Sequence, residues 1–223
     1  MKSGTGARLH EVGGWRDRRL PRVLDIWQRS FPPREQMPLS WWVDLLNARE
    51  NSPSSPGDGT RRVLLAVVAP QDDPNEDVCG MAYYEAFACG GERIGWLYYL
   101  AVDPRRRGGG IGRDAYRDVA ERVQGEDGCG VLFFEVEDPA EVARTQDAAA
   151  ADLARRRIAW YRRNGARRLS GVRYIQSVGW QSGFEMGLML HAFAEIAPER
   201  AFALVRAALE NGAVEQIGPL GLD

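Results

Sequence analysis

Apolar residues recur with two different periods along the chain, and these periods predict both helices and strands. Leu24, Trp27 and Phe31 lie three and four residues apart, the spacing that places side chains on one face of a helix. Short apolar runs rich in β-branched and aromatic residues predict strands instead. The predicted helices cover residues 19–30, 39–49, 110–123, 141–164 and 198–211. The predicted strands cover residues 62–69, 78–88, 93–102, 131–137, 167–176 and 185–193.

The order of these segments, ααβββαβαββα, determines the fold class that we expect. The first three strands follow one another through polar connections, which favours an antiparallel meander. The chain shows no internal repeat and no clear linker. We therefore expect an α/β (α+β) fold, with a single domain over residues 1–223 and a mixed, mostly antiparallel sheet of six or seven strands flanked by helices. Residues 1–15 would form a loose arm or a first edge strand.

Composition narrows the functional classes. The chain has 223 residues, of which 44% are hydrophobic and 27% charged, so it can bury a sizeable core. A formal net charge of −2 argues against a general nucleic-acid binder. The N-terminal segment lacks the apolar stretch of a signal peptide, and no apolar run is long enough to span a membrane. A cytoplasmic protein that binds neither nucleic acid nor membrane is expected.

Cysteine and histidine are too scarce and too scattered for several kinds of site. Cys79, Cys89 and Cys129 form no CxxC pair, which argues against a disulfide framework and a structural zinc site. His10 and His191 are the two histidines of the sequence. We expect no metal site and no histidine-dependent triad, and His191 is interpreted as a core histidine on a late strand.

The chemically most informative segment is the arginine- and glycine-rich turn of residues 105–112. It follows an apolar strand and the turn Asp103-Pro104, and it leads into a helix. Glycines let the backbone approach a ligand and adopt positive φ, while N–H groups at a helix start bind phosphate. Arginines add charge-assisted hydrogen bonds. The turn therefore predicts a site for a phosphorylated ligand, in preference to a solvated arginine loop.

A dinucleotide is an alternative ligand for this turn. Residues 110–115 match the GxGxxA fingerprint, and an acidic residue follows about 20 positions later. In that fingerprint, however, the glycines follow their strand almost at once, whereas seven residues separate Val102 from Gly110 here. The preceding strands also read as hairpins rather than βαβ units. Coenzyme binding of the nicotinamide or flavin type is therefore disfavoured.

Two motifs in the right order resemble a known family. The run Arg107-Gly108-Gly109-Gly110-Ile111-Gly112 fits the Arg/Gln-x-x-Gly-x-Gly signature of the GNAT acetyltransferase superfamily. The run from Ile158 to Gly165 is similar to the aromatic-Tyr-x-x-x-Gly segment of that family, and residues 20–35 resemble its paired N-terminal helices. The resemblance covers about residues 15–195, which leaves residues 196–223 as a helical C-terminal extension.

The resemblance implies a fold, a cofactor and its site. The sheet would splay in the middle to admit CoA, and acetyl-CoA would be the co-substrate, with no metal. Backbone groups of the strand end would pair with the pantetheine arm or stabilise the oxyanion, and N–H groups of the turn would hold the pyrophosphate. The implied cofactor-binding residues are Leu100, Ala101, Val102, Arg107, Gly108, Gly109, Gly110, Ile111 and Gly112.

The chain departs from the family pattern after these motifs. A family asparagine has no counterpart in Leu153-Ala154-Arg155, and Gly165-Ala166 replaces the usual Gly-Phe. Some CoA contacts would then come from other side chains, with Arg157, Arg162 and Arg163 as candidates.

Direct acetyl transfer to an amine needs a base for the ammonium and an acid for the thiolate. The resemblance places Tyr161 near the sulfur, as the acid. For the base, Glu135 is the preferred candidate; Glu137, Glu85 and a chain of waters are the alternatives, and Glu137 could instead pair with arginines of the following helix. Glu135 and Glu137 alternate with apolar residues, so both should point to one face of their strand.

The acceptor is the least determined part of the function. The aromatic residues expected near it, most of which should be core, are Trp27, Phe31, Trp41, Trp42, Tyr98 and Tyr99. The function that we predict is that of an N-acetyltransferase, which acts on a primary amine of a small molecule or peptide through a ternary complex. The alternative is a catalytically silent, CoA-sensing or partner-binding domain of the same fold. The final helix and late strands could support a homodimer.

Overall fold

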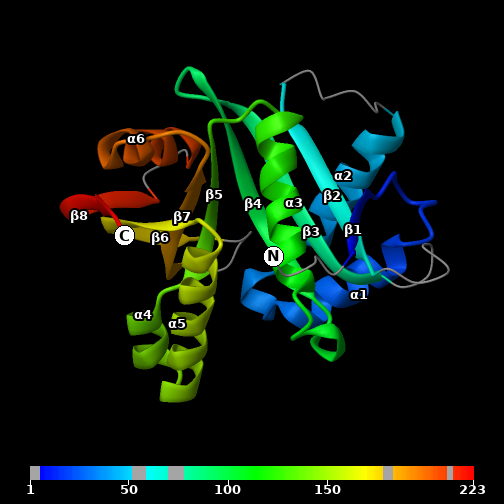
Figure 1. The fold of residues 1–223 in the computed structure, drawn as a ribbon, viewed down its shortest axis with the longest axis horizontal. Coiled ribbons are helices and arrows are strands. Elements are labelled where there is room, and N and C mark those ends of the chain that lie inside the picture. The colour runs from blue at the N-terminus through cyan, green and yellow to red at the C-terminus, as the bar shows by residue number, and fades with distance from the viewer. Residues whose placement is uncertain (1–5, 52–58, 70–77, 178–182, 210–212) are drawn as a thin grey trace. The chain divides into compact units, whose positions relative to one another are not determined.

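The computed structural model describes residues 6–51, 59–69, 78–177, 183–209 and 213–223 (Figure 1). Within these ranges, eight strands hydrogen-bond in the order β1-β2-β3-β4-β5-β7-β6-β8, and helices accompany them, so the expected mixed α/β fold is confirmed. The chain divides into two compact units. Unit 1 comprises Met1–Phe87 and Leu97–Asp127, and unit 2 comprises Ala88–Trp96 and Gly128–Asp223.

Unit 1 carries an antiparallel sheet with helices on both faces. Its elements are β1 (Arg8–Glu11), α1 (Leu20–Ser30), a 3-10 turn (Pro33–Glu35), α2 (Leu39–Asn51), β2 (Arg61–Val68), β3 (Val78–Cys89), the second half of β4 (Glu92–Val102), a second 3-10 turn (Pro104–Arg106) and α3 (Ile111–Gly125). Residues 63–68 of β2 are buried without alternation, because this strand is covered on both sides. The short edge strand β1 confirms one of the two forms expected for the N-terminal residues.

Two consecutive tyrosines of β3 show which helices cover which face. Successive side chains of a strand point to opposite faces. The Tyr83 ring lies 5.5 Å from the ring of Trp42 in α2. The Tyr84 hydroxyl instead donates a 2.9 Å hydrogen bond to Asp127, just beyond α3. The helix α2 therefore packs on one face of unit 1 and α3 on the other, as Figure 1 shows.

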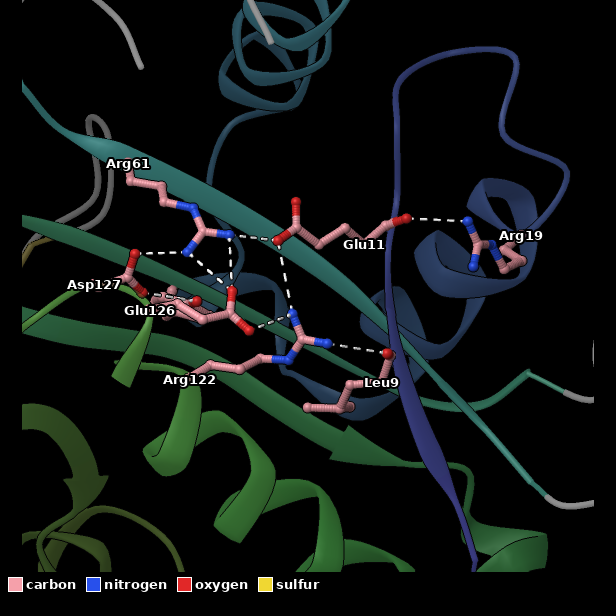
Figure 2. A network of polar contacts seen from close by, with 8 residues as sticks. Leu9, Glu11, Arg19, Arg61, Arg122, Glu126 and Asp127 are labelled. Atoms are coloured by element: carbon pink, nitrogen blue, oxygen red, sulfur yellow. Dashed lines mark hydrogen bonds and ion pairs between the residues drawn. The ribbon is translucent and has the colours of Figure 1, made fainter. Parts of the chain in front are cut away.

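A polar network fastens the α3 face of unit 1 (Figure 2). Arg61 of β2 pairs with Glu11 of β1 at 2.5 Å and with the buried Asp127 at 2.6 Å. Arg122 of α3 reaches Glu11 at 3.7 Å and Glu126 at 3.5 Å. Strands β1 and β2 and the end of α3 are thereby joined through charged side chains.

Unit 2 holds the antiparallel strands that follow α3. Its elements are the first half of β4, β5 (Val131–Glu137), α4 (Pro139–Thr145), α5 (Ala148–Arg163), β6 (Arg167–Gln176), β7 (Phe184–Ala192), α6 (Pro198–Ala208) and β8 (Val214–Leu222). Strand β7 pairs with β5 on one side and β6 on the other, so the last hairpin is inserted with its second strand next to β5.

The single helix predicted over residues 141–164 is wrong, because the chain forms α4 and α5 there. Gln146 has φ −128° and ψ −114°, far from helical values, and ends α4. Asp147 then caps α5, accepting a 2.7 Å hydrogen bond from the Ala150 N–H. Val142, Ala151 and Ala154 pack together, which folds the two helices against each other.

The C-terminal segment also differs from its prediction. Helix α6 ends at Ala208, and the last residues form β8, which pairs antiparallel with β6. Over the described residues the sheet therefore has eight strands rather than six or seven. The pairing of β6 with β8 shifts register between Ser170 and Val172, at Gly171. Gly171 has φ of 78°, and an added Cβ would lie 2.1 Å from the Pro219 carbonyl oxygen. Only glycine fits there.

Candidate active site

Asp103 anchors the start of the arginine–glycine turn in unit 1. Its backbone N–H donates to the Cys79 carbonyl of β3 at 2.8 Å, and its carboxylate accepts from the Arg105 N–H at 3.0 Å. Arg22 of α1 forms an ion pair with the same carboxylate. The Arg105 hydrogen bond, assisted by Arg22, lowers the pKa of Asp103. Asp103 is a structural residue of the site that the sequence analysis treated only as part of a turn.

The glycines of the turn adopt conformations that other residues disfavour. Gly108 and Gly110 have φ of 91° and 92°, in the left-handed region. A Cβ added at Gly108 or Gly109 would meet nothing within 4 Å, so the backbone lies open there. Gly110 is the N-cap of α3 and has no side chain to accept from the first N–H groups of the helix. An open backbone before an uncapped helix start is suited to an anion.

The remaining residues expected to bind the cofactor lie in this turn or at the end of the strand before it. Leu100, Val102, Ile111 and Gly112 are half-buried, and Ala101 is buried. Arg107 is exposed, and its Nε donates a 3.1 Å hydrogen bond to the Val102 carbonyl. That carbonyl is one of the groups expected to pair with pantetheine. Because a carbonyl has two acceptor lone pairs, Arg107 and a pantetheine amide can share it.

Most of the expected acceptor aromatics form a packed cluster of unit 1. The rings of Trp27, Phe31 and Trp42 lie 6.0, 4.7 and 6.3 Å from the ring of Tyr99. The Tyr99 hydroxyl donates to the Glu35 carbonyl and accepts from the Met37 N–H, both at 2.8 Å. These rings therefore hold the connection between α1 and α2 against β4. Trp27, Trp42 and Tyr99 are core, as anticipated for most of the aromatic residues, whereas Phe31 is half-buried.

Tyr98 and Trp41 differ from that cluster because each exposes much of its ring. Tyr98 is 41% exposed and stacks on Tyr83 at 5.4 Å, while Trp41 is 50% exposed on α2. Since Tyr98 and Tyr99 both contact the α2 face, β4 departs from regular alternation between them, as at a β-bulge. Tyr98 is the aromatic side chain of β4 that a ligand could reach.

Tyr161 lies at the end of α5 in unit 2. Its ring is half-buried, with its centroid 4.5 Å from Phe134 of β5 and 4.8 Å from Trp160. Burial raises the pKa of Tyr161 to about 12, and the positive charge of Arg157 offsets part of this shift. The hydroxyl is therefore protonated at neutral pH and chemically able to donate a proton.

Glu135 lies on β5, and its carboxylate is held by two side chains of β6. The Tyr174 hydroxyl donates to Oε1 at 2.5 Å, and the Gln176 amide donates to Oε2. Since β5 and β7 pair without a register shift, Glu135 points to the opposite face from Phe134, on which Tyr161 packs. The two candidate catalytic side chains are therefore not brought together: they lie on opposite faces of β5.

The alternative bases are engaged in ion pairs. Glu137 accepts a 2.7 Å hydrogen bond from Arg157 of α5, which is the pairing considered for it. Glu85 accepts from the Tyr83 hydroxyl at 2.5 Å and lies 3.2 Å from Arg62.

The other arginines and histidine proposed from the sequence have simple environments. Arg162 and Arg163 are exposed at the end of α5. His191 is half-buried beside Gly165, and burial lowers its pKa. This environment agrees with a core histidine.

Tyr174 and Gln176 are site residues that the sequence analysis missed. They lie two apart on a late strand, which predicts a shared face, but nothing local indicates that they reach across β7 to Glu135. The partner of a long-range hydrogen bond depends on strand order, and this order was not predictable for the last hairpin.

The described part of the chain offers no group of three or more histidine, cysteine or acidic residues that could hold a metal ion. Cys79, Cys89 and Cys129 are buried, and none of these three described cysteines forms a disulfide. Among the described residues, no helix has both the length and the apolar character needed to cross a membrane.

Solved structures of known acetyltransferases share this fold. A ribosomal-protein-alanine N-acetyltransferase from Brucella melitensis is 19% identical, with a TM-score of 0.52 over 83% of this chain and 99% of that chain. A putative GNAT acetyltransferase from Desulfovibrio desulfuricans is 20% identical, with a TM-score of 0.53 over 85% and 100% of the two chains. Arabidopsis thaliana NAA60 in complex with acetyl-CoA is 16% identical, with a TM-score of 0.53 over 84% and 98%.

Sequence comparison gives the family. A search of curated proteins found no significant match. The model of the acetyltransferase (GNAT) family matches residues 20–145, which include the whole arginine–glycine turn and Glu135 and end before Tyr161. Because this match spans more than half of the 223 residues, the chain belongs to the acetyltransferase (GNAT) family.

Proposed function

We propose that the protein is an N-acetyltransferase that moves an acetyl group from acetyl-CoA directly to a primary amine of a small molecule or peptide. The observation that carries this proposal is the turn of residues 105–112, whose open, positive-φ glycines precede an uncapped helix start. Family membership and the acetyl-CoA complex of the similar NAA60 structure support the same donor.

The donor site in this proposal lies within unit 1. Backbone N–H groups from Arg107 to Gly112 bind the pyrophosphate, and the strand end at Leu100 and Val102 pairs with the pantetheine arm. Ala101 and Leu100 contribute backbone N–H groups to the developing oxyanion. Asp103 keeps the turn in place through its hydrogen bonds to Arg105 and Cys79.

Proton transfer is assigned to Glu135 and Tyr161. An alkylammonium has a pKa of about 10 and must lose a proton before attack, and the CoA thiolate gains one on leaving. The amine enters and the thiolate leaves at different positions of one tetrahedral carbon, so the base and the acid need not touch. Glu135 and Tyr161 lie on opposite faces of β5, which is compatible with one acting as the base for the amine and the other as the acid for the thiolate. No covalent acetyl-enzyme is required.

Two similar structures favour a peptide amine as one acceptor to test first. Arabidopsis thaliana NAA60 and Naa50, at 15% and 16% identity, were solved with bisubstrate analogues, and that of Naa50 is CoA-Ac-MVNAL. The exposed ring of Tyr98 on β4 is the candidate for aromatic contact with the acceptor in this chain.

A domain that binds CoA without catalysis is the alternative. One observation favours it: both oxygens of Glu135 already accept hydrogen bonds from Tyr174 and Gln176. An acetylated amine among the products would exclude this alternative.

The decisive experiment incubates the protein with acetyl-CoA and a panel of amines that includes short peptides with free N-termini. Mass spectrometry identifies products, and free thiol is measured in parallel. We expect acetylated amine and CoA in equal amounts. Thermal stabilisation by acetyl-CoA with no product would support the non-catalytic alternative. Stabilisation by NAD but not by CoA would contradict both.

A further inference from the structure

Resting on the proposed function, we infer that Tyr174 and Gln176 are positioning residues for the candidate base Glu135. Their side chains hold the two carboxylate oxygens of Glu135 in one orientation and favour its ionised form. Neither residue needs to touch the acetyl group. They act through Glu135, and they determine the pH at which it can accept a proton.

The sheet of unit 2 explains how residues of β6 reach β5 across the intervening β7. Glu135 lies opposite Leu188 of β7, and Met186, two residues away, lies opposite Tyr174 of β6. Residues opposite one another in an antiparallel pair share a face, so these side chains all lie on one face. Gln176 is two residues beyond Tyr174 and shares that face. The tyrosine ring gives the reach needed to cross β7.

The chemistry of the contact favours the carboxylate form. A phenol O–H and an amide N–H both donate to Glu135, at Oε1 and Oε2. Hydrogen bonds to the ionised form lower a carboxyl pKa, and fixing both oxygens restricts the side-chain rotamer. Gln176 Oε1 is buried and has no hydrogen-bond partner within the described residues. A purely structural cluster would be expected to satisfy such an atom.

Several other charged groups of unit 2 form ion pairs with one another. Glu137, on the same strand, is paired with Arg157 of α5. On β6 and β7, Arg173 is paired with Glu185 and with Glu215 of β8. On the helix side, Arg200 of α6 is paired with Glu92 of β4. His191 of β7 lies opposite Leu132, which shares a face with Phe134 and not with Glu135. Tyr174 is a titratable group that contacts Glu135 directly, through its hydroxyl.

The test is the pH dependence of kcat/KM for acetylation in Tyr174→Phe, with the acceptor found for the wild type. Loss of a hydrogen-bond donor to the carboxylate raises the pKa of Glu135. The acidic limb of the kcat/KM profile should therefore move to higher pH by about one unit. Well below that limb, activity should fall about tenfold, while acetyl-CoA affinity stays unchanged. In a Glu135→Gln background, Tyr174→Phe should produce no further shift.

Tyr84→Phe is the matched control, because its hydroxyl also donates to a carboxylate, that of Asp127 in unit 1. It should lower thermal stability and leave the acidic limb in place. An active Tyr174→Phe with the wild-type limb, or a shift that persists in Glu135→Gln, overturns the positioning role alone. Wild-type protein that binds acetyl-CoA and acetylates no amine overturns the proposed function and this inference with it.

Discussion

At the residue scale, three tyrosines show how the surroundings of a hydroxyl determine what it can do. Burial and neighbouring carboxylates raise the pKa values of Tyr83 and Tyr84 far above the ordinary range, and their hydroxyls donate to Glu85 and Asp127. Burial raises the pKa of Tyr161 to about 12, with Arg157 opposing the shift. Tyr161 thus stays protonated at neutral pH, which suits proton donation to a thiolate.

Tyr161→Phe should lower kcat at saturating acetyl-CoA at least tenfold, because the thiolate then leaves without its proton donor. The dissociation constant for acetyl-CoA should change little, since the ring still packs on Phe134. Steady-state kinetics and calorimetry check the two quantities. An unchanged kcat would remove Tyr161 from the mechanism.

Asp17 provides a residue-scale prediction for stability. Burial raises the pKa of Asp17, but hydrogen bonds from Arg19 and from the Gly13 N–H outweigh it and hold this pKa at about 2, below its ordinary value of 3.8. A depressed pKa stabilises the fold above the unfolded value, and this stabilisation is lost as pH falls through the folded value. The relevant window therefore extends from about pH 4 down to about pH 2.

Asp17→Asn should lower the free energy of unfolding by about 2 kcal/mol at pH 7, the scale of hydrogen bonds to a charged group. The difference in the free energy of unfolding between Asp17→Asn and the wild type should fall to zero between pH 4 and pH 2. Urea unfolding across this range measures it. Asp152→Asn is the control, because Asp152 and its partner Arg155 are both exposed and such pairs contribute little. A gap that stays constant across this window would contradict the assignment.

At the element scale, the end of β4 is positioned by its neighbour β3. A Cβ added at Gly80 of β3 would lie 2.6 Å from the Ala101 carbonyl oxygen. That oxygen is backbone, so β3 or β4 must move to accept the extra atom. The close approach of these two strands therefore depends on glycine.

Gly80→Ala should displace β4 and weaken acetyl-CoA binding about tenfold, with a stability cost of about 1–3 kcal/mol from overpacking. Calorimetric titration and thermal unfolding measure the two effects. Gly13→Ala is the control, since a Cβ there meets nothing within 4 Å. Wild-type affinity in Gly80→Ala would show that this approach does not position the cofactor strand.

Elements with strong local signals were predicted well, and those defined by distant contacts were not. The run before Asp103-Pro104 was predicted as a strand and forms β4, and two of the three glycines before α3, Gly108 and Gly110, have the predicted positive φ. The break at Gln146-Asp147 was missed because alanine and arginine on either side are good helix formers. The strand β8 was missed because its glycines and proline oppose strand formation until β6 supplies a partner.

At the scale of the whole molecule, stability in unit 1 depends on charged groups that join distant segments (Figure 2). Asp127 has a side chain only 1% exposed and accepts from both Arg61 and Tyr84. Removing one partner of such a buried pair leaves a charge without compensation. The prediction that the chain is one domain over residues 1–223 stays a prediction, which the number of unfolding transitions would test.

Arg61→Met should lower the free energy of unfolding by about 3 kcal/mol, because Asp127 and Glu11 lose their shared cation. Denaturant unfolding at pH 7 measures this. Arg144→Met removes an exposed ion pair with Glu141 and should cost less than about 1 kcal/mol. Equal losses in the two variants would mean that the network is no stronger than a surface pair.

The sequence by itself predicted a phosphate-binding turn in this protein. The turn of residues 105–112 is contiguous, and glycine backbone freedom, arginine charge and a helix start are local properties. Tertiary structure decided the rest: which aromatic rings are core, that Glu137 is paired with Arg157, and that Glu135 is held from β6 across β7. The contacts of Glu137 and Glu135 join residues 20 to 41 positions apart, and strand order and long-range packing select such partners.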